Sequence, residues 1–413
     1  MDITTTERSK ARSFIIAWVF GLLFYFLEYV IRASPAVMIN ELSAAFKVNA
    51  LGVSTILGTY YYTYSITSLI AGVALDRFGA KSPIAVGIGI LAIGCILFAV
   101  PSVPAGDGGR LLQGAGSAFA FTGCVYLASH GFAARYIATA IGLTQCVGMM
   151  GGSAGQFIVG PMIHSGMPVG TFWIGIGIVC GIIGVLLYFT TPQENKVSEH
   201  QSSALSIIVP YKIVFSNLQS YLSGLLSGLL FAPTTIFAMT WGVAFFQQDR
   251  QFDYSDAVLT CSMVPLGWVI GCPLLGWISD RIGRRKPVLT GGILVMLLAF
   301  FQIVFIPGLL PAVASMFIFG TASGAAMIPY TIIKEANPDS VKGSATGGIN
   351  FLTFGVTAFL GPFYAAMYGK NLMTVKDHAL HFRQAGVFIL IVISAALVLS
   401  LIIRETGLKY RKV

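Results

Sequence analysis

The sequence contains little charge for its length. Only 10% of its 413 residues are Asp, Glu, Lys or Arg, whereas soluble proteins carry about 25%. Apolar residues make up 56% of the chain, and the mean hydropathy is +0.81. These values exclude an ordinary soluble globular protein. Long apolar runs recur without the alternating segments typical of membrane β-barrels, so we predict an all-α membrane protein.

The sequence also lacks the motifs of metal and enzyme chemistry. Its cysteines lie in apolar runs without CxxC spacing, so we expect packing residues and not disulfides or metal ligands. His130 and His164 have no metal-ligand spacing. Neither a Walker loop nor a nucleophile elbow is present. We therefore expect no enzyme activity, no cofactor and no metal, and we expect any transport to be driven by an ion gradient or by the solute's own gradient.

No removable signal peptide and no N-glycosylation sequon are recognisable in the sequence. The missing sequon favours the inner (cytoplasmic) membrane of a bacterium. The net charge of +9 could suggest nucleic acid, but most of the basic residues fall on one side of the predicted spans. This is the positive-inside pattern, so the basic balance indicates orientation and we expect no nucleic-acid partner.

Twelve segments are apolar enough and long enough to cross a membrane, which takes about 20 residues each. Six fall in an N-terminal half, 1–190, and six in a C-terminal half, 217–413, with a cytoplasmic linker over 191–216. We interpret the polar stretch Thr191 to Ser206 as a flexible tether. An even number of spans and basic residues near both ends place both termini in the cytoplasm. The predicted spans are 14–38, 51–75, 82–101, 108–130, 136–163, 168–190, 217–246, 255–278, 288–306, 311–333, 343–369 and 384–403.

A charged hairpin occurs once in each half. The first copy is Gly72-x-x-x-Asp76-Arg77-x-Gly79-x-Lys81, and the second contains Gly276 and Asp280-Arg281-Ile282-Gly283-Arg284-Arg285-Lys286. The two aspartates are 204 residues apart. A Gly-Pro pair repeats similarly, at Gly160-Pro161 and at Gly361-Pro362, 201 residues apart. We infer a duplicated six-helix unit.

The two hairpins resemble the best-known signature of the major facilitator superfamily. The stretch Arg110-Leu-Leu-Gln113-Gly114-Ala-Gly116 is similar to the family's second motif. The resemblance implies two pseudo-symmetric halves around a central cavity that is exposed alternately to each side. We expect the hairpins to bias this equilibrium, with the glycines allowing a neighbouring helix to pack closely and the aspartates pairing with an arginine or capping a helix. The predicted gating residues are Gly72, Asp76, Arg77, Gly79, Arg110, Gly276, Asp280, Arg281, Gly283, Arg284 and Arg285.

The alternative is that the hairpin charges are only inside-facing loop charges. The first copy lacks the arginine pair of the second, since Ala80 stands before Lys81. We therefore expect a weaker latch in the N-terminal half.

The first predicted span contains Glu28 and Arg32, which lie four residues apart and share one helix face. Ionisable residues inside a membrane are functional candidates. We expect Arg32 to face substrate or to take part in coupling, and Glu28 is a candidate protonatable group; a structural ion pair is the alternative. Tyr29-x-x-Arg32-x-x-x-Ala36-x-Met38 resembles the organophosphate and organic-anion branches of the family.

Other polar and aromatic residues are predicted to line the cavity. Tyr64 with Ser68 or Tyr61 is the preferred pair in the second span, although aromatic belts explain such tyrosines equally well. Interhelical hydrogen bonding competes with ligand binding for the amides, and interface anchoring competes with cavity closure for Trp241. The remaining candidates are Gln145, Gln156, Asn350 and Phe354.

We predict a secondary transporter that takes up a small polar organic solute, such as a carboxylate, an amino acid or a short peptide, with protons or another coupling ion. It is expected to be a monomer in the lipid bilayer. The seventh span, 217–246, contains no charge, which disfavours a doubly charged phosphate ester. The alternatives are a drug or metabolite efflux antiporter and a non-transporting membrane sensor or scaffold on the same fold.

Overall fold

The computed structural model describes residues 3–132, 134–194, 205–338, 341–374 and 378–407, and every regular element within these ranges is a helix. The N-terminal half comprises α1 (Ile3–Ala33), η1 (Ser34–Val37), α2 (Ile39–Phe46), α3 (Ala50–Phe78), α4 (Lys81–Phe98), α5 (Val103–Gly131), α6 (Ala134–Phe157), α7 (Val159–His164) and α8 (Val169–Thr190). The linker contributes α9 (Leu205–Phe215). The C-terminal half comprises α10 (Leu218–Ala232), η2 (Pro233–Trp241), α11 (Gly242–Arg250), α12 (Tyr254–Ile282), α13 (Lys286–Phe305), α14 (Ala312–Ser323), η3 (Gly324–Met327), α15 (Ile328–Ala336), α16 (Lys342–Thr374) and α17 (His378–Ile402).

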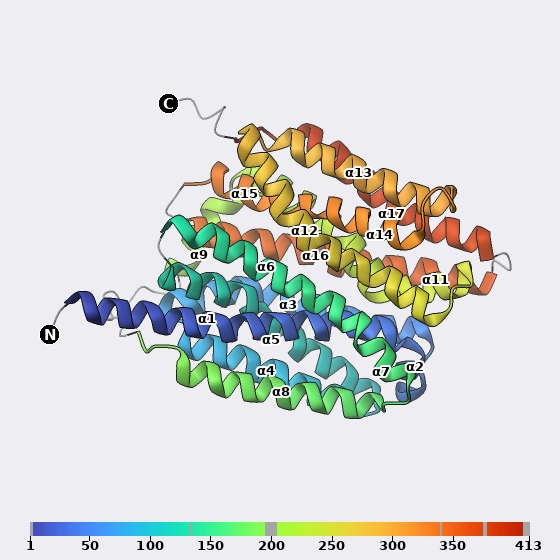
Figure 1. The fold of residues 1–413 in the computed structure, drawn as a ribbon, viewed down its shortest axis with the longest axis horizontal. Coiled ribbons are helices and arrows are strands. Elements are labelled where there is room, and N and C mark those ends of the chain that lie inside the picture. The colour runs from blue at the N-terminus through green and yellow to red at the C-terminus, as the bar shows by residue number, and fades with distance from the viewer. Residues whose placement is uncertain (1–2, 133, 195–204, 339–340, 375–377, 408–413) are drawn as a thin grey trace.

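The described helices account for the predicted membrane spans. By length and composition, 11 stretches of the described residues are able to cross a membrane. The remaining predicted span is α3, a 29-residue helix that runs alongside the others (Figure 1). Its run of tyrosines, serines and threonines lowers its hydropathy without shortening it. The prediction of an all-α, two-half membrane protein is therefore confirmed.

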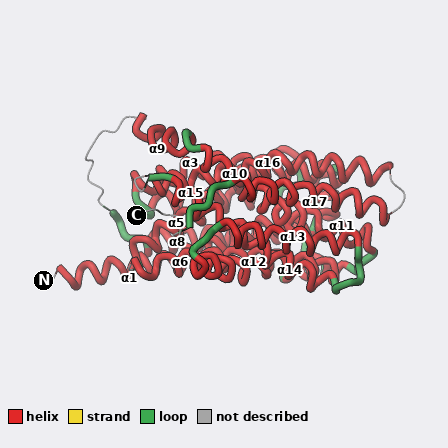
Figure 2. The backbone as a smooth tube through the Cα atoms, turned by 90° about the horizontal axis from the view of Figure 1, so that it is seen from above, coloured by secondary structure: helices red, strands yellow, loops and turns green. Residues whose placement is uncertain are grey.

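The two halves lie side by side as two layers of helices (Figure 1). The start of α1 and the end of α17 lie at the same end of the molecule, and α9 lies there too (Figures 1 and 2). We call this the tether end and the other the opposite end. From the sequence we assigned the polar tether to Thr191 to Ser206. The structure shows that the linker becomes helical at its end, where α9 covers Leu205–Phe215. The predicted tether between 195 and 204 lies outside the described residues.

The contact between the halves follows the internal repeat. The hairpin-bearing helix α3 packs against α16, and its counterpart α12 packs against α6. Both partners belong to the spans with the Gly-Pro pairs: Pro362 lies inside α16, whereas the N-terminal span breaks after Phe157 and resumes as α7. The reciprocal pairing is the correspondence expected of a duplicated unit.

In this structure the glycines of the repeated hairpin make no close helix crossing with the described residues. Among those residues, a Cβ at Gly276 would meet nothing within 4 Å, and one at Gly72 would approach only the Tyr211 hydroxyl, at 3.8 Å. The close helix crossings lie elsewhere: a Cβ at Gly114 would collide with the Tyr60 carbonyl, and one at Gly271 with the Thr321 carbonyl.

The turn glycines of the two hairpins have a clear structural role. Gly79 and Gly283 end α3 and α12 with positive φ angles of 72° and 69°. Glycine adopts this backbone region without the steric cost that a Cβ brings.

Candidate functional site

The predicted pair in α1 forms a buried polar cluster with a tyrosine from α3. Glu28 and Arg32 are 0% and 2% exposed, and Arg32 Nη2 donates a hydrogen bond to Glu28 Oε1. The Tyr60 hydroxyl accepts from Arg32 Nη2 at 3.2 Å and donates to the same Glu28 oxygen. Glu28 and Arg32 meet because residues four apart share a helix face, and the crossing of α3 adds Tyr60.

Aromatic rings surround the Arg32 guanidinium on several sides. Its Cζ lies 4.5 Å from the ring centroid of Tyr29, 4.8 Å from that of Tyr64 and 5.0 Å from that of Phe354. Phe354 belongs to α16, so rings from both halves face this cation, and Tyr61 stacks on Phe354 at 6.3 Å. Ring faces attract cations, and in a water-poor interior they help to hold a guanidinium.

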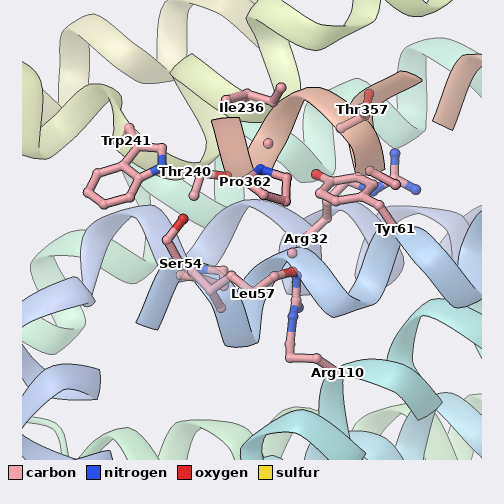
Figure 3. Close-up of a pocket in the computed structure, with 14 residues that line it drawn as sticks. Arg32, Ser54, Leu57, Tyr61, Arg110, Ile236, Thr240, Trp241, Thr357 and Pro362 are labelled. Atoms are coloured by element: carbon pink, nitrogen blue, oxygen red, sulfur yellow. The ribbon is translucent and has the colours of Figure 1, made fainter. Parts of the chain in front are cut away.

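A second buried arginine also contacts Tyr60. Arg110, from α5, is 2% exposed and lies 4.6 Å from the centroid of the Tyr60 ring. Its Nη1 donates to Gln113 Oε1 at 2.7 Å. The prediction grouped Arg110 with the gating residues, whereas the structure places it beside Arg32 at one cavity (Figure 3).

The cavity lies between the two halves and contains about 440 Å³ of space between atoms. Its wall includes Arg32, Tyr61 and Arg110 from the N-terminal half and Ile236, Trp241 and Thr357 from the C-terminal half (Figure 3). Little of this space is wide enough for a water molecule, so the halves are packed closely here. A solute the size of a sugar acid would require them to move apart.

Three polar atoms of this cluster have no hydrogen-bond partner among the described residues: Glu28 Oε2, Arg32 Nη1 and Arg110 Nε. Buried polar atoms are usually paired, and an unpaired one marks a place where water, an ion or a ligand is accommodated. Here the unpaired atoms comprise two cationic donors and one carboxylate oxygen. The cluster is therefore suited to an anion and to a proton.

The other predicted lining residues divide into two groups. Tyr61, Tyr64, Phe354 and Trp241 lie at the cavity or at Arg32. Trp241 is 2% exposed, which rules out the alternative of an anchor at the lipid interface in this conformation. Ser68 is buried away from the cavity and donates to the carbonyl of Ser65 within its own helix.

The predicted amides act between helices. Gln145 accepts from the Tyr25 hydroxyl at 3.1 Å, and Asn350 accepts from the Tyr330 hydroxyl at 2.5 Å. Gln156 Nε2 donates to the carbonyl of Ala238 at 2.5 Å, which links α6 to η2 across the two halves. These contacts match the interhelical alternative that the sequence left open.

Tyr60 is the important residue that sequence reasoning missed. The preferred pair in α3 was Tyr64 with Ser68 or Tyr61, yet Tyr60 joins Glu28, Arg32 and Arg110. A signal was present, because Tyr60 and Tyr64 lie four residues apart and so share one helix face. Tyr62, on another face, is 44% exposed.

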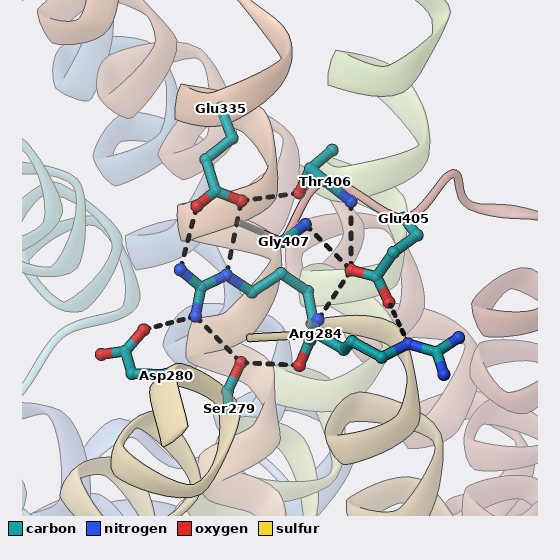
Figure 4. Close-up of polar contacts among 8 residues, drawn as sticks. Ser279, Asp280, Arg284, Glu335, Glu405, Thr406 and Gly407 are labelled. Atoms are coloured by element: carbon teal, nitrogen blue, oxygen red, sulfur yellow. Dashed lines mark hydrogen bonds and ion pairs between the residues drawn. The ribbon is translucent and has the colours of Figure 1, made fainter. Parts of the chain in front are cut away.

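The charged hairpin after α12 forms a compact network (Figure 4). Arg285 donates to Asp280 at 2.5 Å, to Ser279 at 3.0 Å and to Glu335 at 2.9 Å. Burial alone would lower the pKa of Arg285, but its hydrogen bonds to Glu335 and Asp280 outweigh that effect and raise the pKa. The predicted pairing of Asp280 with an arginine is thus present, within the C-terminal half.

A carboxylate from the end of the chain completes this network. Glu405 accepts hydrogen bonds from the backbone N–H groups of Arg285, Thr406 and Gly407 (Figure 4). It accepts a fourth from the backbone N–H of Lys286, at 3.1 Å. Burial would raise the pKa of Glu405, but these hydrogen bonds outweigh burial and lower it. Arg281 lies outside the network, with its guanidinium 5.1 Å from the Trp277 ring centroid, and Arg284 Nε lies 3.8 Å from Glu405.

The first hairpin is built differently. The side chain of Asp76 lies outside the described residues, and Arg77 is exposed. Glu194, just after α8, accepts from the backbone N–H of Ala80 at 3.3 Å and from the Tyr126 hydroxyl at 2.8 Å.

Solved transporter structures share this fold. A bacterial homologue of the human lysosomal transporter Spinster, in an inward-facing and unoccupied conformation, superposes with a TM-score of 0.75 at 14% identity, covering 95% of this chain and 97% of the other. A mutant form of the nucleoside transporter NupG gives a TM-score of 0.72 at 16% identity, covering 93% and 99%. The Major Facilitator Superfamily profile matches residues 20–362. The chain belongs to the major facilitator superfamily.

Curated relatives cover most of the chain. A probable galactarate/D-glucarate transporter of Escherichia coli (strain K12) is 22% identical over 83% of this chain and 84% of its own length. A probable hexose phosphate transport protein of Chlamydia trachomatis is 23% identical over 85% and 83%. The chloroplastic ascorbate transporter of Arabidopsis thaliana is 20% identical over 66% and 54%. Family membership confirms the prediction of a multi-pass membrane transporter and not an enzyme.

Proposed function

We propose that this protein takes up an organic anion bearing at least one carboxylate, in symport with protons. In this proposal Arg32 and Arg110 bind the anion, and Glu28 carries the coupling proton. The observation that carries it is the pair of buried arginines at one cavity, each with an unpaired N–H group.

The arginines suit a carboxylate on chemical grounds. A guanidinium offers several N–H donors in a plane, which matches the two oxygens of a carboxylate. Arg32 and Arg110 both lie near the Tyr60 ring, with their Cζ atoms 5.4 Å and 4.6 Å from its centroid, and a sugar acid with anionic groups at both ends would engage both of them. The aromatic rings at Arg32 supply surface for the carbon skeleton. Arg110 thus provides the second cation that the uncharged seventh span lacks.

The Glu28–Arg32 pair suggests how a proton is coupled to the anion. While Glu28 is ionised, its carboxylate occupies Arg32 and neutralises it. A proton on Glu28 would remove that charge and leave the buried Arg32 cation in need of a new anion. Protonation and anion binding would therefore favour each other, which is the thermodynamic requirement for symport.

The relatives are consistent with an anionic substrate. Galactarate, D-glucarate, hexose phosphates and ascorbate are all anions at neutral pH, and these are the solutes in the relatives' names. For orientation, we place the tether end in the cytoplasm of a bacterial inner membrane, because basic residues concentrate there.

The proposal is tested with purified protein in two steps. Galactarate, which bears two carboxylates, is first screened for a thermal shift alongside glucose 6-phosphate and ascorbate, which bear none, since a ligand of the folded state raises its stability. We expect galactarate to be the most stabilising, and a shift with only the other two would overturn the carboxylate. The most stabilising of the three is then radiolabelled and offered to proteoliposomes with an imposed pH gradient.

We expect Arg32→Lys to lose uptake by about tenfold or more, because a lysine cannot reproduce the planar set of donors. Glu28→Gln should abolish accumulation while sparing exchange of labelled for unlabelled solute. Arg12→Lys, the same substitution at an exposed arginine of the same helix α1, is the matched control and should transport normally. Uptake that is independent of pH would overturn the coupling, and an unaffected Arg32→Lys variant would overturn the binding site.

A further inference from the structure

A second buried acid–base pair lies in the C-terminal half, away from the central cluster. His381, near the start of α17, is 1% exposed, and Asp249, near the end of α11, is 6% exposed. The imidazole Nδ1 lies 2.7 Å and 2.8 Å from the two carboxylate oxygens of Asp249. Asp249 lies at the end of the seventh span, and His381 lies just before the twelfth. The pair therefore links these two spans at the opposite end of the molecule.

The surroundings of the ring indicate its protonation state. Nδ1 faces a carboxylate, and Nε2 faces the carbonyl oxygen of Tyr368 at 3.3 Å. Both neighbours are acceptors. A neutral imidazole carries only one N–H and can satisfy only one of them, whereas the imidazolium donates to both. The arrangement is therefore that of His381 holding an extra proton, with one N–H directed at Asp249 and the other at the carbonyl of Tyr368.

The nearby charged and titratable groups come from the three helices that pack around the pair. Tyr364 and Tyr368 approach from α16, and both feel the charge of Asp249. Arg250 follows Asp249 on α11, and its Nη2 donates to the carbonyl of Ile303 on α13 at 2.6 Å. Arg383 lies further along α17 and is exposed. Among the described residues, Asp249 is the carboxylate that faces the ring.

The pair contacts the walls of two cavities through one tyrosine. The ring of Tyr368 lies 4.8 Å from that of His381 and 4.8 Å from that of Trp241, which lines the central cavity. The Tyr368 hydroxyl donates to Gln248 at 3.2 Å. Gln248 lines a second cavity of about 240 Å³ between the halves, together with Ala244, Glu41 and Tyr254. We call this second cavity the outer vestibule.

We propose that Asp249 and His381 form a proton-binding site separate from Glu28, and that its bound proton holds α11, α16 and α17 together behind the outer vestibule. Loss of the proton would leave one acceptor of the ring without a donor and would remove the positive charge of the imidazolium from beside a buried carboxylate, both of which are costly. The helix ends would then separate and the vestibule would open. The inference does not depend on which solute is transported.

The sign of the pH dependence follows from the environment of His381, which lies outside the membrane-spanning stretch of α17. Burial would lower the pKa of His381, but the hydrogen bond to Asp249 and its negative charge outweigh burial and raise the pKa. The stabilisation of this packing is therefore complete below the ordinary histidine pKa of about 6.5. It is lost as the pH rises through the raised pKa.

The proton-binding site is tested first by NMR of histidine-labelled full-length protein in nanodiscs. The His381 signal is assigned as the one missing from His381→Gln. We expect its pKa to lie above the ordinary value and Asp249→Asn to weaken proton binding by about tenfold or more. His164→Gln, which removes an exposed histidine at the same end, is the control. A His381 that titrates at or below the ordinary pKa, or that ignores Asp249→Asn, would overturn the proposal.

The link to the vestibule is tested with a cysteine in place of Ala244. Its labelling by a membrane-impermeant maleimide is measured with and without His381→Gln, after subtraction of the labelling of the native cysteines. We expect the His381→Gln background to label several-fold faster at pH 6 and the two rates to converge by about pH 9. A constant ratio across pH would indicate packing damage and would overturn the proton-dependent role. Neither test uses a transported solute, so both are independent of the proposed symport.

Discussion

The two halves carry the same hairpin but hold it in different ways. In the C-terminal half, Arg285 is buried among Ser279, Asp280 and Glu335, so an ion-pair network fixes the turn between α12 and α13. In the N-terminal half, Ala80 occupies the corresponding place before α4 and is fully buried. At this position the N-terminal hairpin therefore buries an alanine, where the C-terminal hairpin buries an arginine paired with Glu335.

One device is common to both halves despite this difference. A glutamate just after the last helix of each half accepts a hydrogen bond from the backbone at the start of the helix that follows the hairpin. Glu405 does this for α13 and Glu194 for α4. A carboxylate is favourable there, because the first N–H groups of a helix lack partners within the helix. In each half, this contact ties the end of the last helix to the start of the helix that follows the hairpin. Such contacts within a half help it to move as one rigid body.

Of the variants that test this comparison, Arg285→Ala should lower the stability of the protein the most. Arg285→Ala leaves the partly buried Glu335 without its cation, and breaking a buried pair costs about 3 kcal/mol. Asp280 contributes little to this loss, because its side chain is 70% exposed. We expect a clear drop in the apparent unfolding temperature of the purified protein.

The control for Arg285→Ala comes from the same hairpin and from its counterpart. Arg281 lies over Trp277 at the surface, and Lys81 lies 4.7 Å from the Tyr188 ring centroid. Alanine at either position should lower stability by about 1 kcal/mol or less. Equal losses in all three variants would contradict the contrast between the halves.

The terminal glutamates should show the next largest effect. Glu405→Gln keeps one acceptor oxygen but loses the charge that four N–H groups face, which we expect to cost about 1–2 kcal/mol at neutral pH. Because the folded-state pKa of Glu405 is lowered, its stabilisation is present above the ordinary pKa of about 4.3. It is lost as the pH falls through the lowered value.

Thermal unfolding from about pH 6 down to about pH 2.5, a range that includes the ordinary pKa and the values below it, checks this expectation. The wild type should lose stability toward acid more steeply than Glu405→Gln. Glu194→Gln should have a smaller effect, since Glu194 accepts one backbone hydrogen bond, at 3.3 Å, and one from a phenol. If the two glutamine variants proved interchangeable, the two caps would be energetically equal.

The sequence predicted the features that depend on composition and on neighbours along the chain. Apolar runs of membrane length predicted the spans, and the repeated hairpin predicted the duplicated unit. The four-residue spacing placed Glu28 and Arg32 on one helix face, and their ion pair is the alternative that the sequence left open. The sequence could not predict the third partner, Tyr60, because it depends on how α3 crosses α1. For the same reason it missed that Arg110 lies at the cavity.

Contacts between residues distant in sequence were also beyond prediction. Glu194 and Glu405 follow helices and lie in polar stretches that look like ordinary loops. Only the folded chain brings them to the starts of α4 and α13. Likewise, nothing in the spacing of Asp249 and His381 indicates that α11 and α17 meet. The hairpin glycines Gly72 and Gly276 are a different case. A packing role was predicted for them, but in this structure neither lies at a close helix crossing with the described residues.

The smallest expected effect concerns those motif glycines. Because a Cβ at Gly276 meets nothing within 4 Å and one at Gly72 meets only a hydroxyl at 3.8 Å, Gly276→Ala and Gly72→Ala should change stability by less than about 1 kcal/mol. Gly271, one turn and a residue earlier in α12, is the contrasting position, since its Cβ would strike a backbone carbonyl. Unfolding temperature and transport are measured together. A variant that keeps its stability but loses transport would indicate that a neighbouring helix packs against that glycine in another conformation. The hairpin would then contribute to gating in a state in which the two halves are arranged differently.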